Sequence, residues 1–211
     1  MECSILVLDL DGTLSDPSLG ITRCFNHALK TFGFNALPEE QIAREIGPPL
    51  DGMFLKLVPS LDAAAVPELV ATYRERYADI GYAENTLYDG IPEALAALAS
   101  SGLAMGVCTS KRRDFAEKIV SMFELSRFFT FIDGGDIGIT KAMQLGGLLE
   151  SGAIDGKAVM VGDRSVDIAS AQENNLRSIG VLWGFGSHAE LSAASPSKIL
   201  QEIAELPGCV N

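Results

Sequence analysis

Short, uninterrupted apolar runs recur along the chain, and stretches with helical spacing separate them. The runs cover residues 4–10, 103–109, 128–133, 158–163 and 177–183, and the helical stretches cover 91–100, 112–123, 141–150 and 165–174. Continuous rather than alternating hydrophobicity is typical of strands that are buried on both faces. Strands that alternate with helices predict a parallel sheet of βαβ units, so the predicted fold class is α/β with a Rossmann-like sheet.

The interval between the first two runs has a different character. Residues 16–85 show no strand pattern, whereas helical spacing or helix start and stop signals appear at 20–34, 38–47 and 67–81. We therefore predict that an α-helical domain is inserted after the first strand. The predicted domains are a discontinuous core, residues 1–15 and 86–211, and an inserted helical cap, residues 16–85.

The composition narrows the possible function classes. The 211 residues include 28 acidic and 16 basic side chains, for a net charge of −12, which disfavours nucleic acids and anionic membranes as partners. The four cysteines lie far apart and form neither a zinc-ligand nor a disulfide pattern. No signal peptide or membrane span is evident, so the expected localisation is cytoplasmic. A monomer and a homodimer both remain open.

Carboxylates gather where the predicted strands end. Asp9 and Asp11 follow the first strand, Asp163 ends the fourth, and Asp167 lies one helical turn later. Ligands bind at the carboxyl ends of the strands in an open parallel sheet. Four carboxylates at one edge would repel one another without a cation. Mg²⁺ is the cation expected for oxygen ligands that also handle phosphate, so the sequence predicts a Mg²⁺ site.

Donors for a phosphate follow two other strands. Thr109 and Ser110 end the second strand, and Lys141 opens the helix after the third. Their hydroxyl and ammonium groups can hold a phosphoryl group next to a metal ion. The plainer alternatives are a helix cap for Thr109 and a surface lysine for Lys141.

The D-x-D spacing of Asp9 and Asp11 adds a mechanism. Residues two apart in an extended segment point the same way. One carboxylate can then attack phosphorus, while the other protonates the leaving oxygen and later activates water. Gly12 permits the tight turn that follows. The plainer alternative is a solvated turn, because Asp-Gly is a common turn pair.

Three motifs give the chain a resemblance to the haloacid dehalogenase superfamily, and to its phosphatases in particular. "DLDGTL" (9–14), "VCTSK" (107–111) and "VGDRSVDI" (161–168) match its first, second and fourth motifs in order. "EIGPPL", "YRERY", "LYDGIPEAL" and "GVLWGFGS" look like the phosphoglycolate-phosphatase-like branch, which carries a helical cap. The dehalogenases proper lack the second aspartate, so Asp11 argues against that branch.

The resemblance implies a role for each site residue. Asp9 would form the aspartyl-phosphate, and Asp11 would be the general acid/base. The metal ligands would be Asp9, Asp11 through its main-chain carbonyl, Asp163 and Asp167. The phosphate-binding residues would be Leu10, Asp11, Thr109, Ser110 and Lys141.

The third-motif lysine departs from the family pattern. It usually sits in a G-K-P-like context, whereas this chain reads "GITKAMQL". We assign it to Lys141 because this residue lies between the third and fourth strands. Lys157 is the rival, although its place just before the fourth strand suggests the far end of the sheet.

The favoured function is a Mg²⁺-dependent phosphomonoester hydrolase that acts on a small phosphorylated metabolite. Phosphoglycolate is the preferred substrate, and the cap would be a lid that closes on it. A 5′-nucleotidase is the first alternative, followed by a pyrophosphatase or a sugar-phosphate mutase. A receiver-like signalling module is the alternative from a different class.

The cap sequence offers no readable substrate signature. Its basic residues are either substrate contacts or, more plainly, solvated helix charges; they include Arg23, Arg44, Lys56 and Arg74. Residues 47–49, Gly-Pro-Pro, are either a helix stop or a loop that lowers onto the active site.

Overall fold

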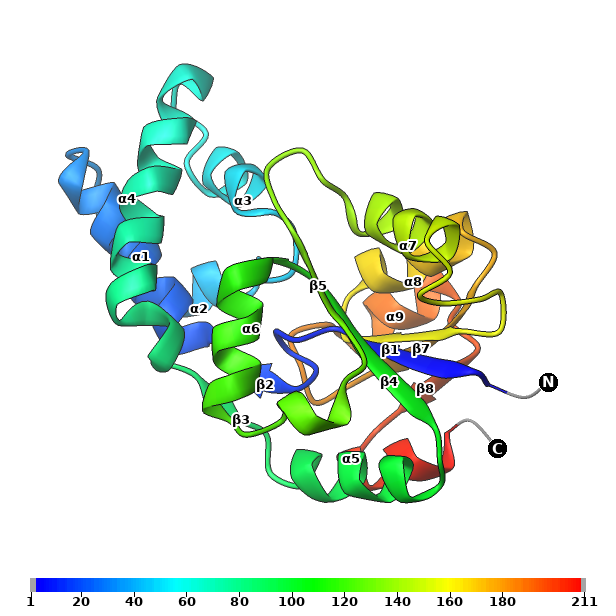
Figure 1. Ribbon diagram of the computed structural model, residues 1–211. Coiled ribbons are helices and arrows are strands. Elements are labelled where there is room, and N and C mark those ends of the chain that lie inside the picture. The colour runs from blue at the N-terminus through cyan, green and yellow to red at the C-terminus, as the bar shows by residue number, and fades with distance from the viewer. Residues whose placement is uncertain (1–2, 210–211) are drawn as a thin grey trace.

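A six-stranded sheet forms the centre of the molecule in the computed structural model, which describes residues 3–209 (Figure 1). All of its strands are parallel, in the order β5-β4-β1-β6-β7-β8. The strands are β1 (Ile5–Leu8), β4 (Ala104–Arg112), β5 (Ile132–Gly135), β6 (Val159–Gly162), β7 (Arg177–Val181) and β8 (Lys198–Leu200). The predicted α/β fold with a parallel sheet is therefore confirmed.

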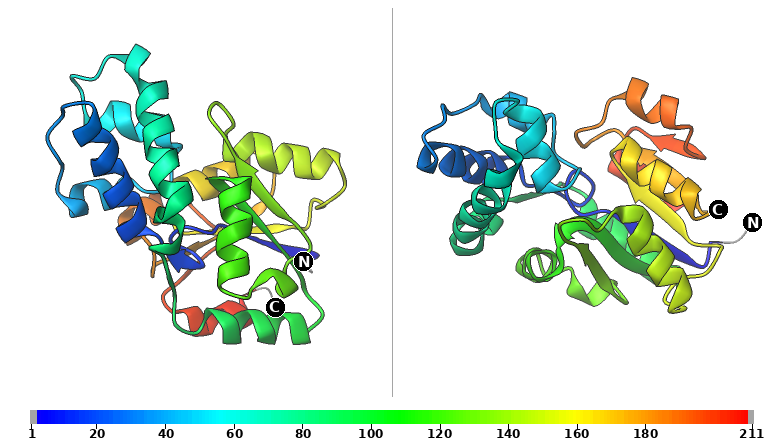
Figure 2. Two further views of the ribbon diagram at one scale, coloured as in Figure 1. Left: turned by 60° about the vertical axis from the view of Figure 1, so that its left-hand side comes forward. Right: turned by 90° about the horizontal axis from the view of Figure 1, so that it is seen from above.

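Both faces of the sheet are buried, as the apolar runs predict. Leu6 and Leu8 of β1 face the cluster built with α5 (Ile91–Ser100) and α6 (Arg113–Met122). Ile5 and Val7 face the opposite cluster, built with α7 (Lys141–Glu150) and α8 (Ser165–Glu173). Two further views show these helices on opposite sides of the sheet (Figure 2). Since β1 is central and fully covered, its carboxyl end is a fixed platform for the residues that follow.

The helical region inserted after β1 has a hydrophobic core of its own. It contains α1 (Ser18–Thr31), α2 (Glu39–Ala43), α3 (Leu50–Leu57) and α4 (Val66–Asp79). Phe25 of α1 stacks on Phe54 of α3 with ring centroids 4.2 Å apart, and both rings are fully buried. The apolar residues of each long helix recur at helical spacing, so that they form one face, which is buried against the other helices.

A short two-stranded ladder connects the cap to the core. β2 (Ser15–Asp16) pairs antiparallel with β3 (Thr86–Leu87). The expectation that residues 16–85 contain no strand is therefore wrong at residue 16, because a two-residue strand leaves no detectable pattern. The ladder lies at the borders predicted for the cap, but the division into 1–15 with 86–211 and 16–85 stays a prediction.

Other differences from the predicted elements are local. β8 and α3 were not predicted. β5 begins at Ile132, later than predicted, because the aromatic residues before it include the short helix η3 (Ser126–Phe128). The remaining elements are α9 (His188–Ala194), η1 (Ala63–Ala65), η2 (Gly81–Ala83) and η4 (Ile203–Gly208). No helix between residues 3 and 209 combines the length and apolar character needed to cross a bilayer.

Candidate active site

Three buried carboxylates meet at the carboxyl edge of the sheet. Asp9 follows β1, Asp163 follows β6, and Asp167 lies in the first turn of α8. Each offers one carboxylate oxygen, and these oxygens all lie within 4.8 Å of one another. β1 and β6 are neighbours in the sheet, so their parallel alignment brings together residues that are about 150 positions apart.

Lys141 neutralises part of this charge. Its Nζ lies 2.8 Å from Asp9 Oδ2 and also donates to Asp167 Oδ1, and its side chain is fully buried. Burial alone would lower the pKa of Lys141, but the carboxylates of Asp167 and Asp9 outweigh it and hold the pKa above its ordinary value. Lys141 is therefore a permanent cation within the cluster.

One lysine does not balance three carboxylates. Burial, together with the charges of Asp167 and Asp9, raises the pKa of Asp163 well above its ordinary value. Burial also raises the pKa of Asp167 to about 6, against the opposing effect of Lys141. Both shifts indicate a site that lacks positive charge. The oxygen donors, their spacing and this deficit fit a divalent cation such as Mg²⁺.

The loop after β1 is shaped around Asp163. Gly12 has φ of +79°, and a Cβ atom there would lie 2.3 Å from Asp163 Oδ2. On the other side, the backbone N–H of Phe185 donates to that same oxygen at 2.8 Å. The Thr13 hydroxyl lies 3.4 Å from Asp163 Oδ1. Glycine is thus required at position 12 for both its backbone angle and the missing side chain.

Asp11 points away from the three-carboxylate cluster. Its Oδ2 lies 2.9 Å from Lys111 Nζ, while its Oδ1 is buried and accepts no hydrogen bond from the described part of the chain. Burial raises the pKa of Asp11 above its ordinary value, although the adjacent Lys111 opposes this. A carboxyl group with a raised pKa suits a proton donor. No role is predicted for Lys111 from the sequence, although this residue stands in the quoted "VCTSK" motif.

The predicted phosphate-binding residues surround Asp9. Thr109 is buried in β4 at the point where the regular pairing with β5 ends, and both Thr109 and Ser110 line a cavity. The Leu10 side chain belongs to the core, so only its N–H faces the site, where it donates to Asp9 Oδ1 at 2.8 Å. The structure therefore brings Leu10, Thr109 and Ser110 to the same edge as Asp9, while their roles stay a prediction.

A cavity of about 90 Å³ lies between this edge and the cap. Its cap side is mostly apolar and aromatic; the residues include Ile21, Ile46, Met53, Tyr73, Tyr77 and, from the core, Phe115.

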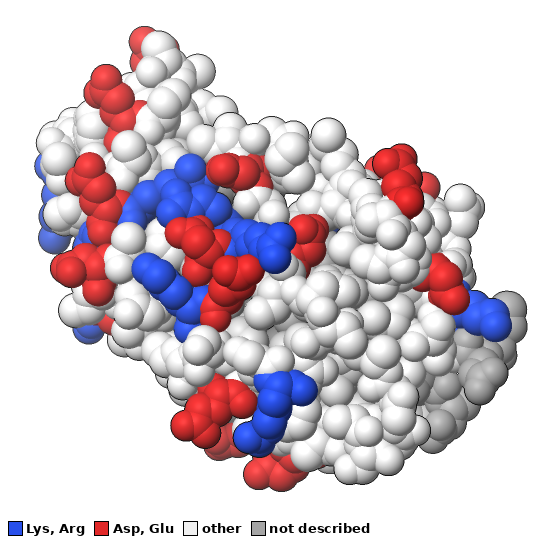
Figure 3. Space-filling model, in the orientation of Figure 1, with Lys and Arg blue, Asp and Glu red and all other residues white. Residues whose placement is uncertain are grey.

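Each of the three basic residues that line this cavity already has an acidic partner. Lys111 pairs with Asp11, Arg74 with Asp136 at 2.6 Å, and Arg112 with Asp114 at 2.6 Å. Basic and acidic side chains alternate across the face where α4 and α6 lie (Figure 3).

The linker before α3 is also part of the site. Gly47, Pro48 and Pro49 line the cavity, and the guanidinium of Arg164 donates to the Ile46 carbonyl and, at 3.3 Å, to the Arg44 carbonyl. Arg164 precedes α8, so it connects the carboxylate cluster to the cap. The geometry supports the loop interpretation of residues 47–49, although no sequence signal identified Arg164.

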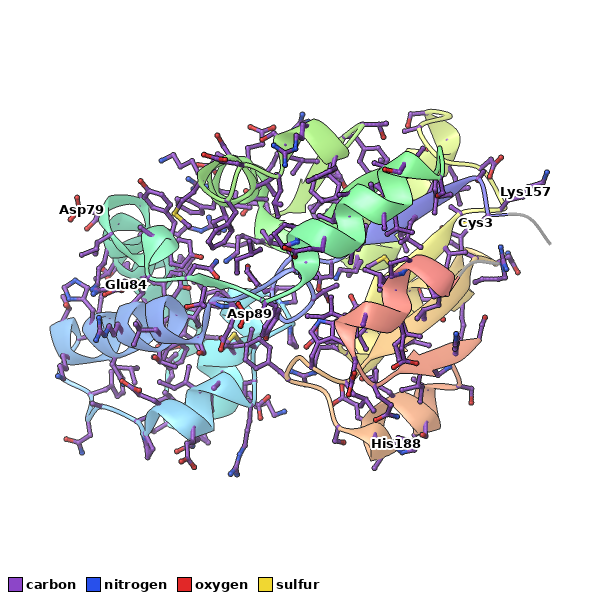
Figure 4. The ribbon with its side chains drawn as sticks, turned by 90° about the horizontal axis from the view of Figure 1, so that it is seen from below. Cys3, Asp79, Glu84, Asp89, Lys157 and His188 are labelled. Carbon is purple, nitrogen blue, oxygen red and sulfur yellow. The ribbon has the colours of Figure 1, made fainter. Side chains whose placement is uncertain are left out.

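The remaining candidates lie elsewhere. Lys157 is exposed, and it lies near Cys3 at the end of the core remote from the cap (Figure 4). Of the four basic cap residues singled out in the sequence, three pair with acids on the cap itself: Arg23 with Glu84, Lys56 with Glu45, and Arg44 with Glu40.

Comparison with known proteins identifies relatives over almost the whole chain. Residues 6–181 match the family model "Haloacid dehalogenase-like hydrolase". A 5′-nucleotidase of Pseudomonas aeruginosa is 38% identical over 205 residues, 95% of this chain and 92% of its own length. A phosphoglycolate phosphatase of Photobacterium profundum is 27% identical over 95% of this chain and 93% of its own length.

Two further matches complete the comparison. The tyrosine-protein kinase PtkA of Mycobacterium tuberculosis is 34% identical over 86% of this chain, which covers 63% of the kinase's length. The crystal structure of a predicted phosphatase from Clostridium acetobutylicum has a TM-score of 0.93 and 33% identity, and covers 99% of this chain and 98% of that one. The family match excludes the receiver-module alternative. The chain belongs to the haloacid dehalogenase-like hydrolases, as a phosphatase with a helical cap inserted between strands.

Proposed function

We propose that the protein is a Mg²⁺-dependent phosphomonoester hydrolase that works through an aspartyl-phosphate on Asp9. The observation that carries this proposal is the arrangement around Asp9. Its carboxylate lies at the end of the central strand, held by Lys141, beside two further carboxylates and next to the loop that carries Asp11. A buried nucleophile with a neighbouring proton donor is what phosphoryl transfer to a carboxylate requires.

The proposed reaction has two steps. Asp9 attacks phosphorus, the bond from phosphorus to the ester oxygen breaks, and Asp11 donates a proton to that leaving oxygen. Asp11, now ionised, then takes a proton from a water molecule. The resulting hydroxide attacks the phosphorus of the aspartyl-phosphate and releases inorganic phosphate, which regenerates both carboxyl groups.

The other residues bind and orient. Asp9, Asp163 and Asp167 would hold the metal ion, with the main-chain carbonyl of Asp11. When bound, Mg²⁺ would neutralise charge on the phosphoryl oxygens. Lys141 would share that task from its place beside Asp9. Thr109, Ser110 and the N–H of Leu10 would donate hydrogen bonds to the phosphoryl group.

The lining of the cavity favours a leaving group that is uncharged and at least partly apolar. Its basic residues are already paired, so a carboxylate on the leaving group would be desolvated without a free cation. A nucleoside meets this requirement, and the 5′-nucleotidase relative matches over 95% of the chain. We therefore rank nucleoside 5′-monophosphates first, ahead of the phosphoglycolate preferred from sequence.

Phosphoglycolate is the second candidate because the cavity is small. About 90 Å³ is well below the roughly 300–1,000 Å³ of drug-sized ligand sites, and a glycolyl group is small. In that case Arg74 would leave Asp136 and pair with the glycolate carboxylate. A nucleoside would instead require α4 and the linker before α3 to move outward.

The test is phosphate release with Mg²⁺ and with EDTA. The panel holds nucleoside 5′-monophosphates, 2-phosphoglycolate, phosphotyrosine, pyrophosphate and several sugar phosphates. Asp9→Asn is the blank, and Asp155→Asn, an exposed aspartate beside Ser4, is the matched control. We expect metal-dependent turnover that is lost in Asp9→Asn and kept in Asp155→Asn. Equal turnover in wild type and Asp9→Asn, or none on any ester, would refute the proposal.

A further inference from the structure

Lys111 makes three contacts that join the core to the cap. Its Nζ lies 2.9 Å from Asp11 Oδ2, donates to the Tyr77 hydroxyl at 2.7 Å, and lies 4.5 Å from the centroid of the same tyrosine ring. Its side chain is only 7% exposed. Because the Lys111 ammonium group contacts both the Asp11 carboxylate of the core and the Tyr77 hydroxyl of the cap, its position depends on the positions of both groups.

The backbone of the core is shaped to aim Lys111 at this place. The pairing of β4 with β5 shifts between Thr109 and Arg112, so that three steps along β4 correspond to one step along β5. A Cβ atom on Gly134 would lie 2.4 Å from the backbone of Arg113, and one on Gly135 would lie 2.9 Å from a β4 carbonyl. The irregularity therefore depends on two consecutive glycines. Bulges next to active sites commonly redirect a side chain.

Tyr77, the cap residue in this contact, is also held in place by its neighbours. Tyr77 lies on α4 and is 1% exposed. Its ring stacks on Tyr73 with centroids 5.5 Å apart and meets Phe115 of the core edge-on at 5.0 Å. The hydroxyl can reach Lys111 only while α4 rests on the core, because Phe115 and Lys111 both belong to the core.

The contact determines which oxygen of Asp11 is free. Lys111 engages Oδ2, whereas Oδ1 accepts no hydrogen bond within residues 3–209 and is buried beside the cavity. An oxygen held in this way is directed toward a substrate that sits between Asp9 and the cap. Without Tyr77, the ammonium group would lose one of its two polar partners and could move away.

We infer that Lys111 is a positioning residue that holds Asp11 for proton transfer to the leaving group while Tyr77 of the cap is docked against it. Asp11 would then act as a general acid only while the cap is closed, that is, while α4 rests on the core. This inference rests on the proposed function. During ester cleavage the Asp11 proton moves to the leaving oxygen as the bond from phosphorus to that oxygen breaks, and Lys111 itself exchanges no proton or bond.

The test compares two leaving groups. A nucleoside alkoxide needs a proton, whereas 4-nitrophenolate leaves without one, and kcat/KM reports only the steps up to the cleavage of the ester. We expect Lys111→Met to lower kcat/KM for a nucleoside 5′-monophosphate at least about tenfold, and for 4-nitrophenyl phosphate less than about threefold. Lys157→Met, which removes an exposed lysine at the far end of the core, should change neither.

Tyr77→Phe is an independent test of the contact with Lys111, because the substitution keeps the ring packing and removes only the hydroxyl. We expect it to lower kcat/KM for the nucleotide selectively, and to cause no further loss when combined with Lys111→Met. Tyr82→Phe, another cap tyrosine that contacts Lys118 instead, is the matched control. If Lys111→Met does not fold, the selectivity of Tyr77→Phe decides.

Equal losses on both esters would overturn the inference, because they would indicate that Lys111 binds phosphate or only supports the fold. Independent losses in the double variant would overturn the coupling to Tyr77. A wild-type protein that cleaves neither ester would refute the proposed function itself, and the inference with it.

Discussion

Replacing Lys141 with methionine tests whether the carboxylate cluster depends on this buried cation. The substitution keeps most of the side-chain volume but strands Asp9 and Asp167, whose side chains are 4% and 0% exposed. Removing one partner of a buried ion pair costs about 3–5 kcal/mol. For a chain of this size, 1 kcal/mol shifts Tm by roughly 2–4 °C, so we expect Tm to fall by about 6–20 °C.

The assay is thermal unfolding for Tm and urea unfolding for the free energy, both at pH 8 in EDTA, with Lys157→Met as the matched control. This exposed lysine should contribute within about 0.5 kcal/mol of zero. Asp167→Asn added to Lys141→Met should restore part of the loss, because it removes one stranded charge. The pKa of Asp167 is already raised, to about 6, in the wild type. Protonation therefore relieves the stranded carboxylates at low pH, and the loss should be smaller at pH 5 than at pH 8. A loss equal to that of the control would refute the electrostatic reasoning.

Three further predictions concern the cap, the turn and the metal site. The pKa of Glu84 is lowered because its carboxylate accepts hydrogen bonds from Arg76 of α4 and then from Arg23 of α1. Urea unfolding of Glu84→Gln should show a loss of about 1.5–3 kcal/mol at pH 7, which starts to shrink below about pH 4.3, the ordinary pKa of glutamate, and is gone once the pH lies below the lowered pKa of Glu84. A loss that does not decrease as the pH falls through this range would contradict the ionic account. Gly12→Ala should abolish phosphate release, whereas Gly33→Ala, with nearly the same φ but nothing within 4 Å of the added carbon, should lose only stability, by about 1–3 kcal/mol. Trp183, the single tryptophan, donates to the Thr13 carbonyl at 3.0 Å, so its fluorescence should respond to Mg²⁺ in the wild type and not in Asp163→Asn.

The strands that carry the site were predictable because their burial on both faces leaves continuous apolar runs. β1, β4, β6 and β7 were therefore found, and the parallel arrangement followed from the helices between them. β8 is three residues long, and β2 and β3 are two each, which is too short for any periodicity. The aromatic run before β5 was assigned to a strand because aromatic residues signal burial, whereas the backbone pairing begins later.

The site was predictable where residues lie at strand ends. Asp9, Thr109 and Asp163 all follow from this rule, and the partnership of Lys141 with Asp9 agrees with the topology. The contacts of Lys111 were not predictable, because a bulge in β4 changes the direction of its side chain. Arg164 was missed for a related reason, since its partners are backbone carbonyls of the cap and backbone groups carry no sequence signal.

The proposed function depends on Asp9 acting as the nucleophile that becomes phosphorylated. The most direct measurement is borohydride reduction of the protein during turnover, followed by peptide mass spectrometry, because borohydride converts an aspartyl-phosphate to homoserine. We would use Asp11→Asn with 4-nitrophenyl phosphate, since that ester needs no acid to cleave, while hydrolysis of the intermediate lacks its base. We expect homoserine at position 9 and none in Asp9→Asn. Reduction at another residue, or phosphate release from the wild type with no reducible intermediate in either protein, would contradict it.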